Sequence, residues 1–329
     1  MRTGKRAWKC SVSTIDTALL LSGMLVASEY FNLDHQGERE LRRLVRELYE
    51  RVDWRWALNG KKTISHGWKS EIGFLSGGWD KGYNEAHILY FLALGSPTFS
   101  IDPIGYREWT ETFEVREYYQ YRYIYAGPLF IHQMSQLWVD FRGIRDELTR
   151  TLGFDYFENS RRATLAQRQY GIENPLGFKH YGEFGWGITA SDGPGPAVCI
   201  VDGVKRTFYD YVERGAPDDI DDGTISPWAV VTSLPFAPEV VLGTIRHAIE
   251  RLHLKGRRNI KGFDASFNPT FPEYELNQLG WVSHWRFGLN QGPIIIMIEN
   301  FQSGLIWSLL KRNAYLKKGL LKAGFITAQ

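Results

Sequence analysis

Residues 78–97 read GWDKGYNEAHILYFLALGSP, and this stretch passes from a polar, aromatic loop into an apolar helix. Glycine, tryptophan and aspartate dominate its first part, whereas residues 83–95 are mostly apolar. The sequence Gly95-Ser96-Pro97 ends the apolar run, because glycine and proline interrupt helices. The stretch therefore predicts a helix over 83–95 that follows a loop rich in polar and aromatic side chains.

The same alternation of helices and long loops runs along the whole chain. In 36–53, for example, apolar residues recur at helical spacing with Arg and Glu between them. Loops longer than about 12–15 residues in a compact domain are usually functional. This alternation is typical of a helical toroid and also of an irregular helical bundle. Helices are predicted over residues 14–31, 36–53, 83–95, 104–119, 128–141, 155–173, 236–254 and 291–312, and long aromatic loops over 53–80 and 262–287.

Residues 177–226 differ from the rest of the chain because they are rich in Gly, Pro and Asp. Two β-prone runs, 197–201 and 207–212, predict a small hairpin inside this region. We interpret the region as an elaborate loop of an otherwise all-α chain, and not as a second domain.

The composition excludes some classes of function. Among 329 residues, 39 are basic and 37 acidic, for a net charge of +2, and no basic stripe indicates a nucleic-acid partner. The informative excess is aromatic, with 12 Trp, 17 Tyr and 19 Phe. Most aromatic residues serve cores, but a Trp beside Asp, Asn or Gly in a loop can form a flat platform for a sugar ring. The two cysteines, Cys10 and Cys199, show no metal-ligand spacing, so we expect no metal and no cofactor.

The sequence predicts no membrane partner. No stretch is long and apolar enough to span a bilayer. The run from Thr17 to Ala27 is similar to a signal peptide, but Thr14 or Asp16 can cap a helix that continues beyond this run. We therefore interpret the segment as a helix.

Four carboxylates stand beside aromatic residues and glycines. Cleavage of a glycoside usually needs two carboxyl groups, one that protonates the leaving oxygen and one that activates water or attacks the sugar. The acid must hold its proton near neutral pH, which burial or a neighbouring carboxylate can arrange. The candidates for this chemistry are Asp80, Glu85, Glu158 and Glu183.

Each of these carboxylates also has a structural alternative. Asp80 lies at a loop-to-helix junction, where it could cap the helix, and Glu85 could simply favour the helix dipole. Glu158 stands beside two arginines and could form an ion pair. Glu183 is framed by glycines and aromatic residues in an irregular region, which favours a buried, perturbed acid over a solvated charge.

A second group of residues is a candidate for binding a glycan. His132 could equally be a core histidine, Gln291 could cap the helix that follows it, and the aspartates of 191–195 and 221–224 could belong to plain turns. The candidate binding residues are Trp79, Tyr83, Asn84, His132, Gln133, Trp138, Asp140, Arg142, Tyr181, Trp186, Asp192, Asp222 and Gln291.

Short phrases in a fixed order give the chain a resemblance to a known family. The first phrases are STIDTALL from residue 13, GWDKGYNE from 78, LGSPT from 94 and DFRGIRD from 140. Residues 155–164 and 181–193 continue the series. The last phrases are DDGT from 221, SLPFAPE from 233, QGP from 291 and IENF from 298. Together they resemble the glucoamylase-like family, which includes bacterial endo-β-1,2-glucanases and the transglycosylating domain of cyclic β-1,2-glucan synthases.

The resemblance implies an (α/α)6 barrel with a glycan cleft at one end and action on β-glucans, above all β-1,2-glucan. It also implies that Glu183, Asp80, Glu85 and Glu158 are site residues, with an oligo- or polysaccharide as the partner. About two barrel helices normally precede the phrases matched here. We therefore expect residues 1–329 to form a single barrel domain that lacks its first helices. We expect a periplasmic or secreted protein if a longer chain carries a leader, and a cytoplasmic one otherwise.

Several functions remain open at this point. Hydrolysis with inversion leads by resemblance, and a retaining transglycosylase is its nearest rival. A polysaccharide lyase is less well supported, since the aromatic loops contain no dense Arg/Lys cluster. A non-catalytic glycan-binding module is the remaining alternative, because a fold does not guarantee an activity.

Overall fold

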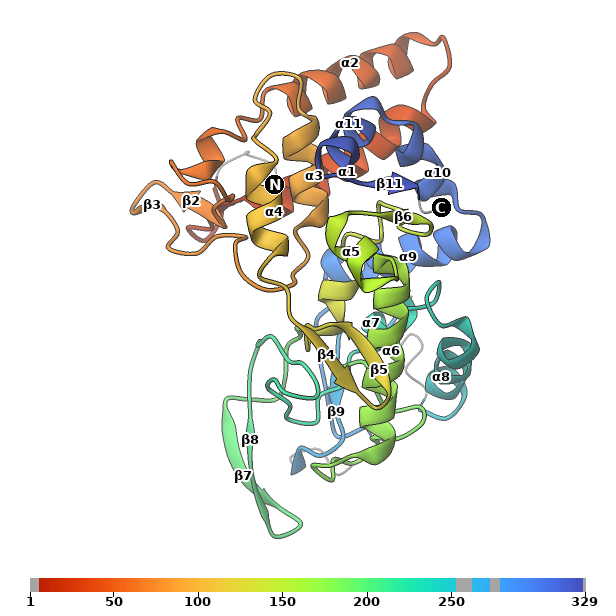
Figure 1. The fold of residues 1–329 in the computed structure, drawn as a ribbon. Helices are drawn as coiled ribbons and strands as arrows, with labels where there is room; N and C mark the ends of the chain where they lie inside the picture. Colours follow the sequence, from red (N-terminus) through yellow and green to blue (C-terminus); the bar gives the residue numbers. More distant parts are fainter. Residues whose placement is uncertain (1–5, 253–261, 273–278, 328–329) are drawn as a thin grey trace. The chain divides into compact units, whose positions relative to one another are not determined.

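The computed structural model describes residues 6–252, 262–272 and 279–327. The chain divides into two compact units, each assembled from segments that are distant in sequence. Unit 1 consists of Met1–Glu114, Trp138–Asp155 and Ile306–Gln329, and unit 2 consists of Val115–Leu137 and Tyr156–Leu305. Figure 1 shows the elements of both units. The expectation of a single barrel domain stays a prediction.

Unit 1 is built mainly from helices. The hydroxyl of Ser13 caps the first helix by accepting a hydrogen bond from the amide of Asp16, and Asp146 and Thr149 form a capping box at the start of α5. The helices are α1 (Thr14–Tyr30), α2 (Gln36–Glu50), α3 (His87–Gly95), α4 (Ile104–Thr110), α5 (Glu147–Leu152), α10 (Leu305–Arg312, across the unit boundary) and α11 (Ala314–Lys322), with a 3-10 turn η1 (Trp56–Leu58).

Helix α3 forms the centre of unit 1, because all nine of its residues are buried. It lies against α11 although more than 200 residues separate them in sequence (Figure 1). A Cβ on Gly319 would meet the carbonyl oxygen of Phe91 at 2.0 Å, and one on Gly95 would meet that of Tyr315 at 2.1 Å. The two helices therefore approach each other through their backbones, and only glycine permits that distance.

The strands of unit 1 are short. β1 (Val12–Ser13), β2 (Gly67–Lys69) and β3 (Gly73–Phe74) form an antiparallel sheet in that order. β6 (Ile144–Arg145) pairs with β11 (Ile326–Thr327), so the C-terminal segment contacts the middle of the chain.

Unit 2 combines helices with three hairpin-like sheets. Its helices are α6 (Tyr156–Glu173), α7 (Pro227–Thr232), α8 (Pro238–Glu250) and α9 (Gly288–Gln302), with a 3-10 turn η2 (Leu129–His132). The pairs are β4 (Val115–Tyr118) with β5 (Tyr121–Ile124), β7 (Ala197–Val201) with β8 (Val204–Phe208), and β9 (Phe267–Asn268) with β10 (Trp281–Val282). Its core surrounds α7, whose six residues are all buried.

The prediction of a mostly helical chain with a small hairpin is confirmed, and the structure adds further small sheets in both units. The helix predicted over 104–119 ends at Thr110, and the alternating tyrosines that follow form β4 and β5 instead. Only a 3-10 turn appears within 128–141. The helix predicted over 291–312 is two helices, because Gly304 adopts a φ of 67° at the break. Helices α5, α7 and α11 were not predicted.

Smaller differences concern boundaries. Helix α3 begins at His87 and not at 83, because the preceding residues form turns. The predicted hairpin exists, but its second strand is Val204–Phe208 and not 207–212. Both Cys10 and Cys199 are free thiols. Within the described ranges, no single helix is long and apolar enough to cross a membrane; α9 and α10 reach that length and hydropathy only when taken together.

Candidate functional site

Two regions gather carboxylates and aromatic side chains, one in each unit, and six of the 17 predicted site residues lie in them. The first is the loop of residues 78–86 in unit 1, which leads into α3. The second is a group of tyrosines and carboxylates in unit 2, which we name the tyrosine–carboxylate cluster. Its members are Tyr118, Tyr119, Tyr125, Tyr170, Tyr181, Glu213, Asp218, Asp219 and Asp221.

Hydrogen bonds hold the first half of the 78–86 loop. The backbone amide of Trp79 donates to Ile64 O at 2.8 Å, and its indole Nε1 donates to Thr14 Oγ1 at 2.9 Å. The hydroxyl of Tyr90 on α3 donates to Trp79 O at 2.7 Å. The predicted sugar platform Trp79 is therefore fixed by three separate elements.

The second half of the loop is held equally firmly. Gly82 donates its amide to Thr112 Oγ1 at 2.8 Å and accepts a hydrogen bond from the indole of Trp109 at 2.9 Å. The side-chain oxygen of Asn84 accepts from the amide of Ala86 at 3.1 Å, which makes Asn84 part of the turn that starts α3. Tyr83, also predicted to bind, is buried. Rigid support of this kind is what a catalytic side chain requires.

Asp80 and Glu85 are the two carboxylates of this loop, and both are half-buried. Asp80 makes no hydrogen bond or ion pair within the described part of the chain. Nearby, burial lowers the pKa of His66, an effect that the negative charge of Asp80 opposes. The ring of His66 lies 4.5 Å from that of Trp79. A half-buried carboxylate without a partner costs free energy, so its position is not explained by stability.

In unit 2, the β4–β5 hairpin contributes one side of the tyrosine–carboxylate cluster. Arg116 binds Asp218 with an N–O distance of 2.8 Å, and its guanidinium lies 4.4 Å from the centre of the Tyr125 ring. The hydroxyl of Tyr118 donates to the same aspartate. Tyr125 contacts the amide of Asp218 and lies 3.4 Å from Asp219 Oδ2. The hairpin therefore holds an aspartate-rich loop through its aromatic side chains.

Asp221 is the most enclosed carboxylate of the cluster. It accepts hydrogen bonds from Tyr181 at 2.7 Å, from Tyr170 at 2.9 Å and from the amide of Gly223 at 3.0 Å. Burial raises the pKa of Asp221, and these donors act in the opposite direction. Burial and the aspartate also raise the pKa of Tyr181, so the tyrosine remains a donor.

Glu213 lies in the same loop and its side chain is exposed. The protein atoms around its carboxyl raise its pKa, and Asp219 adds to this effect. A raised pKa brings a carboxyl closer to the range in which general acids work.

Asp222, a predicted binding residue, instead has a structural position. It forms a two-pronged ion pair with Arg214, with distances of 2.8 Å for both prongs, and neither side chain is exposed. Arg214 also donates to the carbonyl oxygens of Ser191, Tyr209 and Asp210. The pair therefore fixes the backbone that presents Asp218, Asp219 and Asp221.

Glu183 is not buried, contrary to the argument made for it from sequence. Its side chain is 60% exposed and pairs with Arg168 on α6 at 2.9 Å. It borders an open cavity of about 210 Å³ that is also lined by His180, Phe184 and His247. Glu158 is likewise paired, with Arg162 at 2.8 Å on the same helix. Both carboxylates remain site candidates whose charges are already balanced by arginine.

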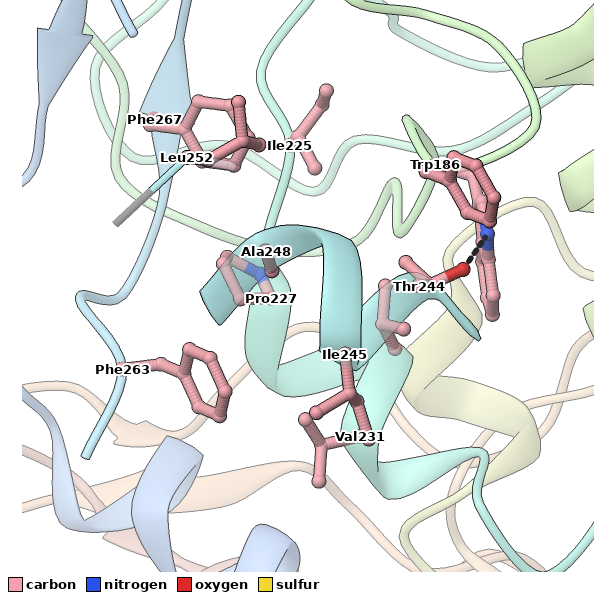
Figure 2. A pocket seen from close by; sticks show the side chains of 12 residues that line it. Trp186, Ile225, Pro227, Val231, Thr244, Ile245, Ala248, Leu252, Phe263 and Phe267 are labelled. Atoms are coloured by element: carbon pink, nitrogen blue, oxygen red, sulfur yellow. Dashed lines mark hydrogen bonds between the residues drawn. The ribbon is translucent and has the colours of Figure 1, made fainter. Parts of the chain in front are cut away.

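Trp186 belongs to an apolar core and not to an open aromatic surface. Its side chain is fully buried, and its indole donates to Thr244 Oγ1 at 3.1 Å (Figure 2). The cavity beside it has a volume of about 20 Å³, enough for about one water molecule. Ile225, Ile245 and Phe267 are among its walls (Figure 2). This cavity is therefore too small for a sugar ring.

Four other predicted binding residues form hydrogen bonds within the protein, although Oε1 of Gln133 is buried and has no hydrogen-bond partner among the described residues. His132 is buried, donates from Nε2 to Ala126 O at 2.9 Å and lies 3.3 Å from the Asn159 amide at Nδ1. Gln133 is also buried. The amide of Gln133 donates to Ala229 O and Ser233 Oγ, Asp192 accepts from Ser266 and Ser283, and Gln291 donates to Phe263 O.

The remaining predicted residues lie together in unit 1. Trp138, Asp140 and Arg142 line a cavity of about 510 Å³. Arg142 binds both carboxylate oxygens of Asp140, at 2.7 and 2.8 Å, and its guanidinium lies 4.7 Å from the Trp307 ring centre. The sequence placed these three residues with His132 and Gln133 on or near one helix, but that helix is absent over the described residues 128–141 and the other two do not line this cavity, whose walls are mainly apolar.

Sequence reasoning missed Glu213, Asp218, Asp219 and the tyrosines of the β4–β5 hairpin. A signal was present, because residues 118–125 read YYQYRYIY, with tyrosine at every second position from 121 to 125. Alternation with a period of two indicates a strand and places these rings on one face. The predicted helix ended at 119, just before this alternation, and no strand was predicted for the residues that follow it.

Comparisons with known proteins agree on one family. The family model described as "Putative glucoamylase" matches residues 78–314. An exo-β-1,2-glucooligosaccharide sophorohydrolase of Parabacteroides distasonis is 28% identical over 335 residues, which cover 94% of this chain and 43% of that protein. The chain thus spans less than half the length of this curated relative.

Solved structures show the same likeness. A protein of Bacteroides uniformis, described as a "putative glucoamylase", is 33% identical with a TM-score of 0.81, over 96% of this chain and 72% of that one. An endo-β-1,2-glucanase of Chitinophaga pinensis, solved with sophorotriose and glucose, is 27% identical with a TM-score of 0.79, over 95% of this chain and 71% of that one. The chain therefore belongs to the glucoamylase-like family.

Proposed function

We propose that this chain is the catalytic part of a glycoside hydrolase that cleaves β-1,2-linked glucan. Two relatives support the substrate, since one is named as a β-1,2-glucooligosaccharide sophorohydrolase and the other as an endo-β-1,2-glucanase. The observation that carries the proposal is Asp80, a half-buried carboxylate without a hydrogen-bonding partner in the described ranges, on a loop held rigid beside Trp79.

In this proposal, Asp80 and Glu85 supply the catalytic carboxylates. Glycoside hydrolysis needs one carboxyl that gives a proton to the leaving oxygen and one that activates water or attacks the sugar carbon. The 78–86 loop offers two such groups on a backbone fixed by Thr14, Tyr90 and Thr112. Glu158 and Glu183 rank behind these two as catalytic candidates, because an arginine already neutralises each of them.

The tyrosine–carboxylate cluster serves as the glycan-binding surface of unit 2. Tyrosine rings supply apolar faces with polar edges, and carboxylates accept hydrogen bonds from sugar hydroxyls. The raised pKa of Glu213 makes it an alternative proton donor within this surface. Trp138, Asp140 and Arg142 remain proposed binding residues in unit 1.

We also propose that the helices belong to one (α/α)6 toroid. The alternation of helices and functional loops supports this arrangement, as does the likeness to solved β-1,2-glucanases. A crystal structure of the chain would decide it.

The function is tested with linear β-1,2-glucan, using β-1,3- and β-1,4-glucans of matched length as controls. We expect new reducing ends from the β-1,2 substrate alone, and products that are short gluco-oligosaccharides. Equal release of reducing ends from all three glucans would contradict the proposed specificity for the β-1,2 linkage. Binding without release would favour a non-catalytic glycan-binding module, and products with the absorbance of unsaturated sugars would favour a lyase.

A further inference from the structure

The turn of the β4–β5 hairpin is strained at two side chains. Tyr118 pairs with Tyr121, so Tyr119 and Gln120 form a two-residue turn. Their φ angles are 52° and 66°, both in the left-handed region. Two-residue turns of this kind strongly prefer Asn, Asp or Gly, since other side chains crowd the backbone there. Tyr and Gln are therefore both unfavourable residues at these two positions of the turn.

Most other positive-φ positions within the part of the chain that the structure describes hold tolerant residues. Tyr119 differs from the remaining exceptions, Trp8 and Lys9, because those two are exposed whereas Tyr119 is half-buried. Strain of this kind persists where the side chain has a function that outweighs its cost. The tolerant residues are Asn59, Asn174, His180 and Asp202.

The ring of Tyr119 packs against two groups of the core of unit 2. One group is formed by Tyr123, Ala163 and Ala166. The other contains Tyr170, and Tyr181 packs against it as well. The strained turn therefore positions this ring within the tyrosine–carboxylate cluster.

The hydroxyl of Tyr119 differs from the hydroxyls of the neighbouring tyrosines in its hydrogen bonding. Tyr118, Tyr125, Tyr170 and Tyr181 each contact an aspartate through the phenolic oxygen. The hydroxyl of Tyr119 has no hydrogen-bond partner among the described residues. Packing holds part of the ring, and because Tyr119 is only half-buried the rest of the ring and the hydroxyl stay accessible to a ligand.

We propose that Tyr119 is a substrate-positioning residue whose ring forms a platform for one glucose unit of the bound glucan. The apolar C–H face of a glucose ring matches an aromatic ring, and the adjacent carboxylates can accept its hydroxyl groups. The proposal rests on the proposed function, and it assigns this part of the binding surface to a single side chain.

The test compares three variants with the wild-type chain: Tyr119→Asn, Tyr119→Phe and Gln120→Gly. Asn keeps the turn but removes the ring, Phe keeps the ring, and Gly at 120 relieves strain without touching the ring. The measurements are Tm without substrate, and KM and kcat on β-1,2-gluco-oligosaccharides. We expect Y119N to raise KM about tenfold, equivalent to about 1.4 kcal/mol of binding free energy, with kcat within threefold. Y119F keeps the ring but loses the hydroxyl, so it should raise KM less than Y119N does. Q120G should keep KM within threefold and raise Tm.

An unchanged KM in Y119N overturns the proposal, whatever happens to its Tm, because it would leave the ring with a structural role only. If Y119N does not fold, Tyr119→Gly suits the left-handed turn and also removes the ring, and an unchanged KM there has the same meaning. Lack of activity in the wild-type chain is a failure of the proposed function and is seen without any variant. In that case Kd is measured in place of KM, by titration calorimetry with the same oligosaccharides. A Kd of Y119N equal to that of the wild-type chain overturns the inference.

Discussion

Tyr181 donates a 2.7 Å hydrogen bond from its hydroxyl to Oδ1 of Asp221, while Tyr170 binds the other oxygen at 2.9 Å. Two phenols on one enclosed carboxylate connect α6, the aromatic 181–187 stretch and the DDGT turn of unit 2. Burial raises the pKa of Asp221, and the two hydroxyl donors favour its ionised form. The state of this carboxylate therefore depends on the tyrosines.

Replacing Tyr181 by Phe removes one of these donors. We expect the pKa of Asp221 to rise further and the unfolding free energy at pH 7 to fall by about 1.5–3 kcal/mol, the usual contribution of a hydrogen bond to a charged group. Urea unfolding measures this loss. Tyr209→Phe is the matched control, because the hydroxyl of Tyr209 makes no hydrogen bond in the described part of the chain. Equal losses in the two variants would contradict the account.

The contact between α3 and α11 depends on the lack of a side chain at Gly319. Ala at 319 would bring a Cβ within 2.0 Å of Phe91 O, so the helices must separate. We expect Gly319→Ala to cost about 1–3 kcal/mol, as overpacking does. Gly292 on α9 has nothing within 4 Å, and Gly292→Ala should stabilise by about 0.5–1 kcal/mol. Thermal unfolding of both variants tests the sign of each effect, and a stabilised G319A protein would refute this helix contact.

The buried pair of Arg214 and Asp222 should be costly to break. Arg214→Met leaves an unpaired charge in a site with no exposure, and such changes usually cost about 3–5 kcal/mol. Arg161→Met removes an exposed partner of Glu239, where a change within about 1 kcal/mol is expected. Denaturant unfolding of the two variants provides the comparison. Similar small losses would show that the 209–222 loop does not depend on this ion pair.

His87 makes the fold sensitive to acid. It is buried among aromatic rings, and burial lowers its pKa to about 3. Because the folded pKa lies below the unfolded value of about 6.5, stability is fully present above pH 6.5 and is lost as pH falls. Each pH unit within this window costs about 1.4 kcal/mol.

A variant isolates this effect. His87→Leu should reduce the loss of unfolding free energy between pH 7 and pH 5 by about 2 kcal/mol, that is, about 1.5 units at 1.4 kcal/mol each. Exposed His284 provides the control, and His284→Leu should keep the wild-type pH dependence. If H87L and H284L show the same slope, His87 is not the group responsible.

Local periodicity predicted the strongly amphipathic or capped helices well. Helices α1, α2 and α6 end within a few residues of their predicted limits, because their apolar spacing and caps are local signals. The short helices α7 and α11 were missed, since their stability comes from burial against distant segments. In 104–119 the helical interpretation ran past Thr110 into β4 (Val115–Tyr118), and the tyrosine alternation at 121–125 that indicates a strand was not used.

The candidate site was predictable only in part. The 78–86 loop was identified because its tryptophan, glycines and carboxylates are adjacent in sequence. Asp218, Asp219 and Asp221 become significant only through Tyr118, Tyr125 and Tyr181, which are 40 to about 100 residues away. Single-sequence patterns carry no information about such pairings. The burial expected for Glu183 also failed, because glycines around an acid place it equally well on an exposed turn.

The most direct measurement of the central claim is the release of reducing ends from linear β-1,2-glucan by the wild-type chain, Asp80→Asn and Glu85→Gln, with Glu158→Gln and Glu183→Gln in parallel. General acid–base groups typically contribute about 10²–10⁴-fold to the rate. The account predicts that wild type cleaves, that D80N and E85Q lose at least about 10²-fold in kcat while still folding and binding oligosaccharide, and that the other two variants lose less. Wild-type rates in both D80N and E85Q would contradict it.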